Sequence, residues 1–246
     1  MRVRRTNMKI AILCAGICLT ALAGGCGGAN SASDTTFAYV MPALNSQRLY
    51  SRVIIDNSGN TINQTISDTV TAVNADGSYE VLVEDPNHDS VTVNGTTYSI
   101  VTESVSVNDS DQDTAYSYAA PDGSTVTCTY VPHGGGPDLP LTVGTTWTLT
   151  YTFSCGANAP VSYTQTGTVV DVESVTVPAG TFSAIKLQST LTWTGPEGVT
   201  RTQTIANFRD VNTLLSVKED ISTAYSGTKL INGYPVSTET VLQSAT

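Results

Sequence analysis

Length, composition and charge narrow the classes of protein from the start. The chain has 246 residues, 40% of them hydrophobic and 13% charged, and its 11 basic and 21 acidic side chains give a formal net charge of −10. A chain this acidic lacks the basic surface that binds nucleic acid, so no nucleic-acid partner is expected. Its apolar content predicts a packed domain instead of a disordered acidic tail.

The first predicted element is an export signal. Arg2, Arg4, Arg5 and Lys9 form a basic head, and residues 10–23 follow without a charge. Fourteen residues at about 1.5 Å each reach only ~21 Å, less than the roughly 30 Å of hydrocarbon that a spanning helix must cross. The pattern therefore indicates a cleaved signal peptide and not a membrane anchor.

The signal ends in the sequence LAGGC at residues 22–26, which resembles the lipobox of bacterial lipoproteins. The resemblance implies that residues 1–25 are removed and that Cys26 carries acyl chains such as palmitate, which hold the protein on a membrane. It departs mildly from the commonest form, because Ala23 stands three residues before the cysteine. An ordinary secretory signal followed by an incidental cysteine is the alternative.

The residue after the cysteine bears on the membrane reached. In Gram-negative lipoproteins an aspartate there often retains the protein at the inner membrane, so Gly27 implies the outer membrane. The protein is expected to face the periplasm there, and the cell surface is the alternative. Residues 26–36 are small and polar and are predicted to form a flexible tether. Without the signal the charge becomes 7 − 21 = −14, so attachment depends on the acyl anchor and not on anionic lipids.

The remaining residues, 37–246, are predicted to form an all-β domain. The chain after Cys26 holds 37 threonines, and β-branched threonine favours strands. Apolar residues alternate by two between turn signals, which predicts an antiparallel meander that closes as a sandwich, a curved sheet or a barrel. The expected strands are 49–55, 61–73, 79–83, a hairpin at 91–98, 116–120, 124–131, 147–153, 161–172, 181–194, 199–205, 214–219, 224–231 and 236–242.

The two halves of this domain, 37–137 and 138–246, are weakly alike. Tyr50 and Tyr79 have counterparts in Trp147 and Phe182 at offsets of 97 and 103 residues. The hypothesis is a duplicated meander of roughly 100 residues with an insertion in the second copy. The alternative is that threonine-rich meanders resemble one another in general.

Residues 177–186 follow the form V-P-A-G-T-F-x-A-x-K and resemble a segment of exported proteins and lipoproteins of unknown function with β-rich domains. The resemblance implies a structural role and no chemistry. A tight turn at 178–180 would direct Phe182 and Ile185 into the core.

Cysteine use agrees with export. Cys14 and Cys18 leave with the signal and Cys26 takes the lipid, which leaves Cys128 and Cys155. An even pair in an oxidising compartment predicts a disulfide, which stabilises the fold by ~3 kcal/mol.

The acidic stretch Asp109, Asp111 and Asp113 is a weak calcium candidate, because its carboxylates occupy alternate positions. The EF-hand pattern fails, since Thr114 stands where glycine is required and Ala120 where a glutamate is required. A solvated acidic loop is the alternative.

No catalytic or cofactor-binding residue is predicted. His133 and the three glycines after it look like the oxyanion-hole loop of esterases, but the chain has no G-x-S-x-G elbow, so a connector is expected. His88 and His133 have no zinc-like spacing. No metal or cofactor is expected.

Aromatic residues supply the last candidates. Tyr116 and Tyr118 share a strand face and could stack on a glycan, whereas Trp147 and Trp193 are expected in the core. The expected function is a non-catalytic binding or scaffolding role at the membrane, with an envelope protein or glycan as partner. The alternatives are a lipid- or glycan-binding module with a cavity in the curved sheet, and a carboxylate-dependent hydrolase.

Overall fold

The computed structural model describes residues 35–88, 91–93, 96–227 and 233–246. The signal peptide, Cys26, Gly27 and most of the tether therefore lie outside the described residues. Within the described ranges no helix is long and apolar enough to cross a membrane.

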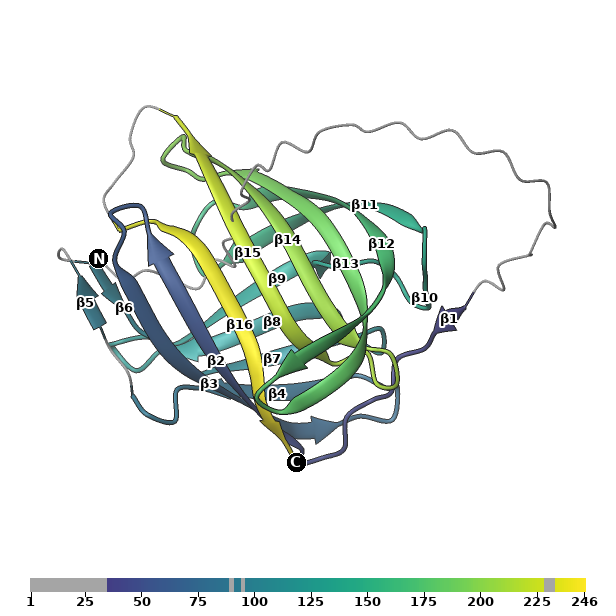
Figure 1. The fold of residues 1–246 in the computed structure, drawn as a ribbon. Helices are drawn as coiled ribbons and strands as arrows, with labels where there is room; N and C mark the ends of the chain where they lie inside the picture. Colours follow the sequence, from purple (N-terminus) through teal and green to yellow (C-terminus); the bar gives the residue numbers. More distant parts are fainter. Residues whose placement is uncertain (1–34, 89–90, 94–95, 228–232) are drawn as a thin grey trace, which may run out of the picture.

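The chain forms an antiparallel β-barrel of twelve strands, closed in the order β11-β12-β13-β14-β15-β16-β2-β3-β4-β7-β8-β9 (Figure 1). Each predicted half supplies six of these strands. Two further pairs, β1-β10 and β5-β6, lie outside the barrel sheet. The strands are β1 (Thr36–Phe37), β2 (Gln47–Asp56), β3 (Thr61–Val73), β4 (Tyr79–Glu84), β5 (Val91–Val93), β6 (Thr96–Tyr98), β7 (Glu103–Val107), β8 (Asp113–Ala119), β9 (Thr125–Gly134), β10 (Leu141–Thr142), β11 (Thr146–Cys155), β12 (Val161–Val177), β13 (Gly180–Thr194), β14 (Thr200–Asp210), β15 (Ser216–Ser226) and β16 (Pro235–Ala245).

The predicted all-β class is confirmed, and of its three forms the barrel is the one observed. Strand β3 has the predicted bounds. The hairpin predicted at 91–98 is observed as β5-β6, with Val91 opposite Tyr98 and Val93 opposite Thr96; its turn lies outside the described residues.

Two strand predictions were wrong. Residues 214–219 and 224–231 were expected as separate strands, but β15 is continuous from Ser216 to Ser226. Near the end of the first of these two predicted strands, the Lys218 ammonium lies 3.1 Å from Asp220 and 3.0 Å from Glu239 on the neighbouring strand. Strand β7 was not predicted at all; it pairs with both β4 and β8.

The alternation in β11 shows how the barrel wall is built. Tyr151 points inward and is buried, while Thr148 and Thr150 lie on the outer face and are exposed. Thr148 opposes Thr166 of β12, which opposes Thr190 of β13, so threonines continue across the outer face from strand to strand. The inner face is thereby left for aromatic, aliphatic and selected charged side chains.

The two ends of the barrel differ. At the end that we call the tether end, β1 pairs with β10 and residues 38–46 run across the barrel, with the Val40 amide bonded to Thr213 and the Asn45 amide to Val70. An apolar cluster fills this end: Leu141, Val169, Ile185, Leu187 and Leu214, with Phe37, Tyr39 and Trp147 packed against it. The opposite end, which we call the hairpin end, carries β5-β6, whose Tyr98 hydroxyl donates to the Gly233 carbonyl.

Strands β9 and β11 join the two halves and meet over only four residue pairs, the shortest ladder in the barrel. Cys128 and Cys155 are direct cross-strand partners in this ladder, and their sulfur atoms form a disulfide. The covalent bond thus reinforces the seam that has the fewest backbone pairs.

Candidate functional site

The main candidate site is a cavity of about 440 Å³ inside the barrel. This volume falls within the roughly 300–1,000 Å³ of small-molecule pockets. The wall of the cavity has a charged part, formed by β14 to β16 with β2 and β3, and an aromatic part, formed by β8, β9, β11 and β12.

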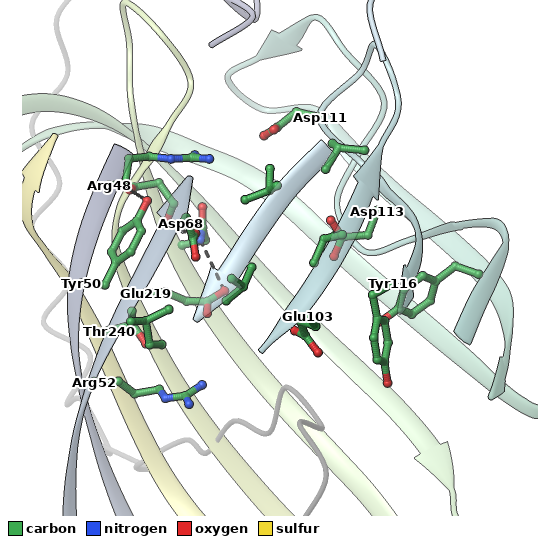
Figure 2. A pocket seen from close by; sticks show the side chains of 18 of the residues that line it. Arg48, Tyr50, Arg52, Asp68, Glu103, Asp111, Asp113, Tyr116, Glu219 and Thr240 are labelled. Carbon is green, nitrogen blue, oxygen red and sulfur yellow. Dashed lines mark hydrogen bonds between the residues drawn. The ribbon is translucent and has the colours of Figure 1, made fainter. Parts of the chain in front are cut away.

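The charged wall places guanidinium, carboxylate and amide groups around one space (Figure 2). Arg52 donates from Nε and Nη2 to Oε1 of Gln64, at 3.1 and 2.8 Å. Asn207 donates from Nδ2 to Oε1 of Glu219, at 3.3 Å. The remaining charged members are Arg48 of β2, Asp68 of β3 and Arg209 of β14.

The aromatic wall is a continuous series of ring contacts. The ring centroids are 6.0 Å apart between Tyr116 and Phe153, 5.1 Å between Phe153 and Tyr130, and 5.9 Å between Tyr130 and Tyr151. Tyr151 and Tyr163 stack nearly parallel, with centroids 5.1 Å apart. Packing of rings against rings holds these side chains in fixed positions, so the wall is preformed.

Phenol hydroxyls of this wall remain free to contact a ligand. Among the described residues, Tyr130, Tyr151 and Tyr163 make no hydrogen bond through their hydroxyl groups. Burial raises the pKa of Tyr163 to about 12 and raises the pKa values of Tyr130 and Tyr151 further. All three therefore stay protonated near neutral pH and can act both as donors and as acceptors.

A second group of carboxylates borders the aromatic wall. Burial, together with the charges of Asp111, Glu103 and Asp68, raises the pKa of Asp113 to about 7, and Arg209 only partly opposes this shift. Near neutral pH the Asp113 carboxyl therefore carries a proton about half of the time.

This shift predicts a pH-dependent stability. The folded-state pKa of Asp113 lies above its unfolded value of about 3.9, so its contribution is most favourable below that value and is lost as the pH rises towards about 7. Relative to the parent, the D113N variant should therefore become progressively more stable as the pH rises from about 3.9 to about 7. Urea unfolding at several pH values measures the difference, and D109N, which changes an exposed carboxylate nearby, is the matched control; a constant difference for D113N would contradict the prediction.

At the tether end, a chain of polar contacts borders the cavity. The Tyr39 hydroxyl donates to that of Tyr79 over 2.8 Å, and Tyr79 donates to Oδ1 of Asp111. Oδ2 of Asp111 lies 2.8 Å from Nη1 of Arg209. We call these four residues the end network; they come from residues 38–46, β4, the β7-β8 turn and β14, so one carboxylate joins four parts of the fold.

The three aspartates of the calcium candidate do not converge on one site. Asp111 binds Arg209 and Tyr79, Asp113 faces the cavity, and Asp109 is exposed and accepts a bond from Ser110. Among the described residues, no group of three or more His, Cys, Asp or Glu side chains could hold a metal ion.

The other sequence candidates are placed as follows. His133 and Gly134 end strand β9, and Gly136 donates its amide to Gln165 over 3.0 Å, so this stretch is a packed connection. His133 lies 3.7 Å from Asp138. Two tyrosines are brought together inside the barrel, since the Tyr116 and Tyr118 rings stack with centroids 6.3 Å apart.

Trp193 lies in the core, as predicted, whereas Trp147 is half-buried and packs against the apolar cluster of the tether end. Trp193 is 4% exposed and stacks on Tyr163. The Trp147 ring lies over the backbone of Gly167, where a Cβ atom would come within 2.3 Å of it.

The charged cavity residues were not predicted. A local signal does exist: Asp68 lies two residues after Ile66 and two before Val70, on the inward face of β3, and Arg52 has the same position between Tyr50 and Ile54 of β2. A charge within an inward-facing apolar alternation indicates a polar interior.

Solved structures that are similar to this chain include the following three. One is a Bacteroides fragilis protein described as exported and as having a YmcC-like fold, with a TM-score of 0.48 and 14% identity, covering 86% of this chain and all of that one. The second is described as a lipoprotein of Parabacteroides distasonis, with a TM-score of 0.46 and 14% identity, covering 87% of this chain and all of the other. The third is the hypothetical lipoprotein YmcC of Escherichia coli, with a TM-score of 0.41 and 12% identity over 84% and 90% of the two chains. No protein-family model matches the chain. A search of curated proteins also gives no match.

Proposed function

We propose that this protein is a lipid-anchored binding protein of the bacterial outer membrane that holds a short saccharide inside its barrel. The anchor rests on the lipobox ending at Cys26. The choice of a saccharide as the ligand is based on one observation, namely that the cavity has one charged and one aromatic wall. The outer membrane rests on Gly27. In this proposal the protein faces the periplasm and performs no chemistry on the ligand.

The charges in the cavity favour a polar ligand over a lipid tail. Three arginines and five carboxylates line the space, the latter being Asp68, Glu103, Asp111, Asp113 and Glu219. Enclosing an alkyl chain would strip these groups of water without giving them new partners, which costs several kcal/mol for each buried charge.

A saccharide matches both walls. Each sugar hydroxyl is at once a donor and an acceptor, so it can donate to a carboxylate while it accepts from a guanidinium or a phenol. Glu219 and Arg52 supply such groups on the charged wall, and the Tyr151 and Tyr163 hydroxyls supply them on the aromatic wall. The C–H surfaces of a sugar ring can then lie against the aromatic side chains.

Filling the cavity tests this function. The V105W variant places an indole in the space, and it should abolish binding that isothermal titration calorimetry detects for maltose, lactose or diacetylchitobiose with the full-length protein. V131W makes the same change at a side chain that is 64% exposed on the outer face, so it should bind like the parent. Failure of all three sugars to bind the parent, or unchanged binding by V105W, would count against the proposal.

A carboxylate-dependent hydrolase is the second candidate, favoured by the raised pKa of Asp113 beside Glu103. A protonated carboxyl could donate to a glycosidic oxygen while an ionised one acts on the opposite side of the bond. Prolonged incubation of the parent and of D113N with the sugars that bind distinguishes the two functions. Cleavage that D113N abolishes would establish the enzyme, and intact sugar with retained binding would establish the binding protein.

A further inference from the structure

Exposed apolar side chains gather at the tether end of the barrel. Nine large apolar residues are exposed in the described part of the chain, and seven of them lie at this end. Three belong to the segment that crosses the end: Val40, Met41 and Leu44 are 52%, 43% and 54% exposed. The other four are Val73, Val143, Val170 and Val172.

The crossing segment is also free of charge. Residues 35–47 contain no acidic or basic side chain, although the whole chain carries a net charge of −10. Tyr39 anchors the segment on the inside through Tyr79, so its neighbours Val40 and Met41 are held outside on a fixed support. An uncharged, rigidly held apolar surface is suited to an apolar medium.

The position of the predicted lipid limits what can cover this surface. Cys26 lies ten residues before Thr36, the first residue of β1, and ten residues fully extended span at most ~35 Å. Because β1 lies at the tether end (Figure 1), the acyl chains keep this end close to the bilayer. A bilayer is therefore available to these side chains at very high effective concentration.

We propose that Val40, Met41 and Leu44 insert into the lipid leaflet that holds the acyl chains of Cys26, so that the barrel stands on the membrane with its tether end down. This inference rests on the anchor in the proposed function and is independent of the ligand. Acyl chains alone would leave the barrel free to rotate on its tether. The apolar contact fixes its direction, and the hairpin end then points away from the membrane.

Tryptophan quenching tests the contact. Full-length lipidated M41W and L44W are reconstituted into phosphatidylcholine vesicles with and without brominated acyl chains, and the emission of the parent, which has Trp147 and Trp193, is subtracted. The matched variant I55W changes a 38% exposed side chain at the opposite end of β2. Brominated lipid should quench the added emission of M41W and L44W several-fold more than that of I55W.

The outcomes separate the contact from the anchor. Equal quenching of the three variants, or stronger quenching of I55W, in protein that floats with the vesicles would overturn the membrane contact and leave the anchor in place. Protein that does not float with the vesicles would overturn both. Sugar binding by the same preparation reports on the barrel ligand separately, because no substituted side chain lines the cavity.

Discussion

Replacing Asp111 with asparagine (D111N) is expected to lower the free energy of unfolding by about 2–4 kcal/mol. The carboxylate lies 2.8 Å from Arg209, and both side chains are largely enclosed, with 16% and 19% exposure. Removal of one partner leaves the guanidinium uncompensated, which costs roughly 3–5 kcal/mol when a pair is fully buried and less where water reaches it. The Tyr79 hydroxyl loses its charged acceptor as well.

Asparagine suits this test because the backbone is left undisturbed. Asp111 has a φ of 58°, a left-handed conformation that asparagine tolerates and alanine does not. D109N makes the same chemical change two residues away, at a carboxylate that accepts a bond from Ser110, and should change stability by less than about 0.5 kcal/mol. The midpoints of urea unfolding measure both, and equal midpoints for D111N and D109N would show that the end network contributes little.

Removal of the disulfide in C128A/C155A is expected to cost about 3 kcal/mol. The two residues are 27 positions apart, and opening a loop of this length restores that much chain entropy to the unfolded state. Because the bond lies in a ladder of only four residue pairs, its loss also weakens the join between β9 and β11.

The control for this pair of substitutions is the parent protein under reducing conditions. Thermal unfolding of the parent in excess dithiothreitol should approach that of C128A/C155A, whereas the double variant should not respond to the reductant. A variant as stable as the oxidised parent would show that the backbone pairs of the seam suffice.

The fold could be predicted where the signal is local. Alternation of aromatic and threonine residues in β11 identifies its inner face, and the Asn94-Gly95 pair predicts the register of β5-β6. Strand β7 was missed because Glu103–Val107 contains only two apolar residues. Its strand conformation depends on pairing with β4 and β8, which the local sequence pattern does not show. Sandwich and barrel could not be separated, since closure depends on the β16-β2 and β9-β11 pairings, which have no local signature.

The site could be predicted less well. The inward position of Asp68 follows from the alternation in β3, yet nothing in the sequence says which of the 21 acidic residues converge. Asp111 and Arg209 are 98 residues apart and meet only because the barrel closes. The raised pKa of Asp113 likewise arises from carboxylates on other strands.

Closure through β16 and β2 also determines the order in which the barrel can be completed. The Gln243 side chain donates to Ser51, 192 residues earlier, at 2.7 Å. Strand β2 pairs with β3 on one edge, but its other edge stays unpaired until β16 binds to it. Such a high contact order slows folding and leaves the edge of β2 open to aggregation until β16 pairs with it.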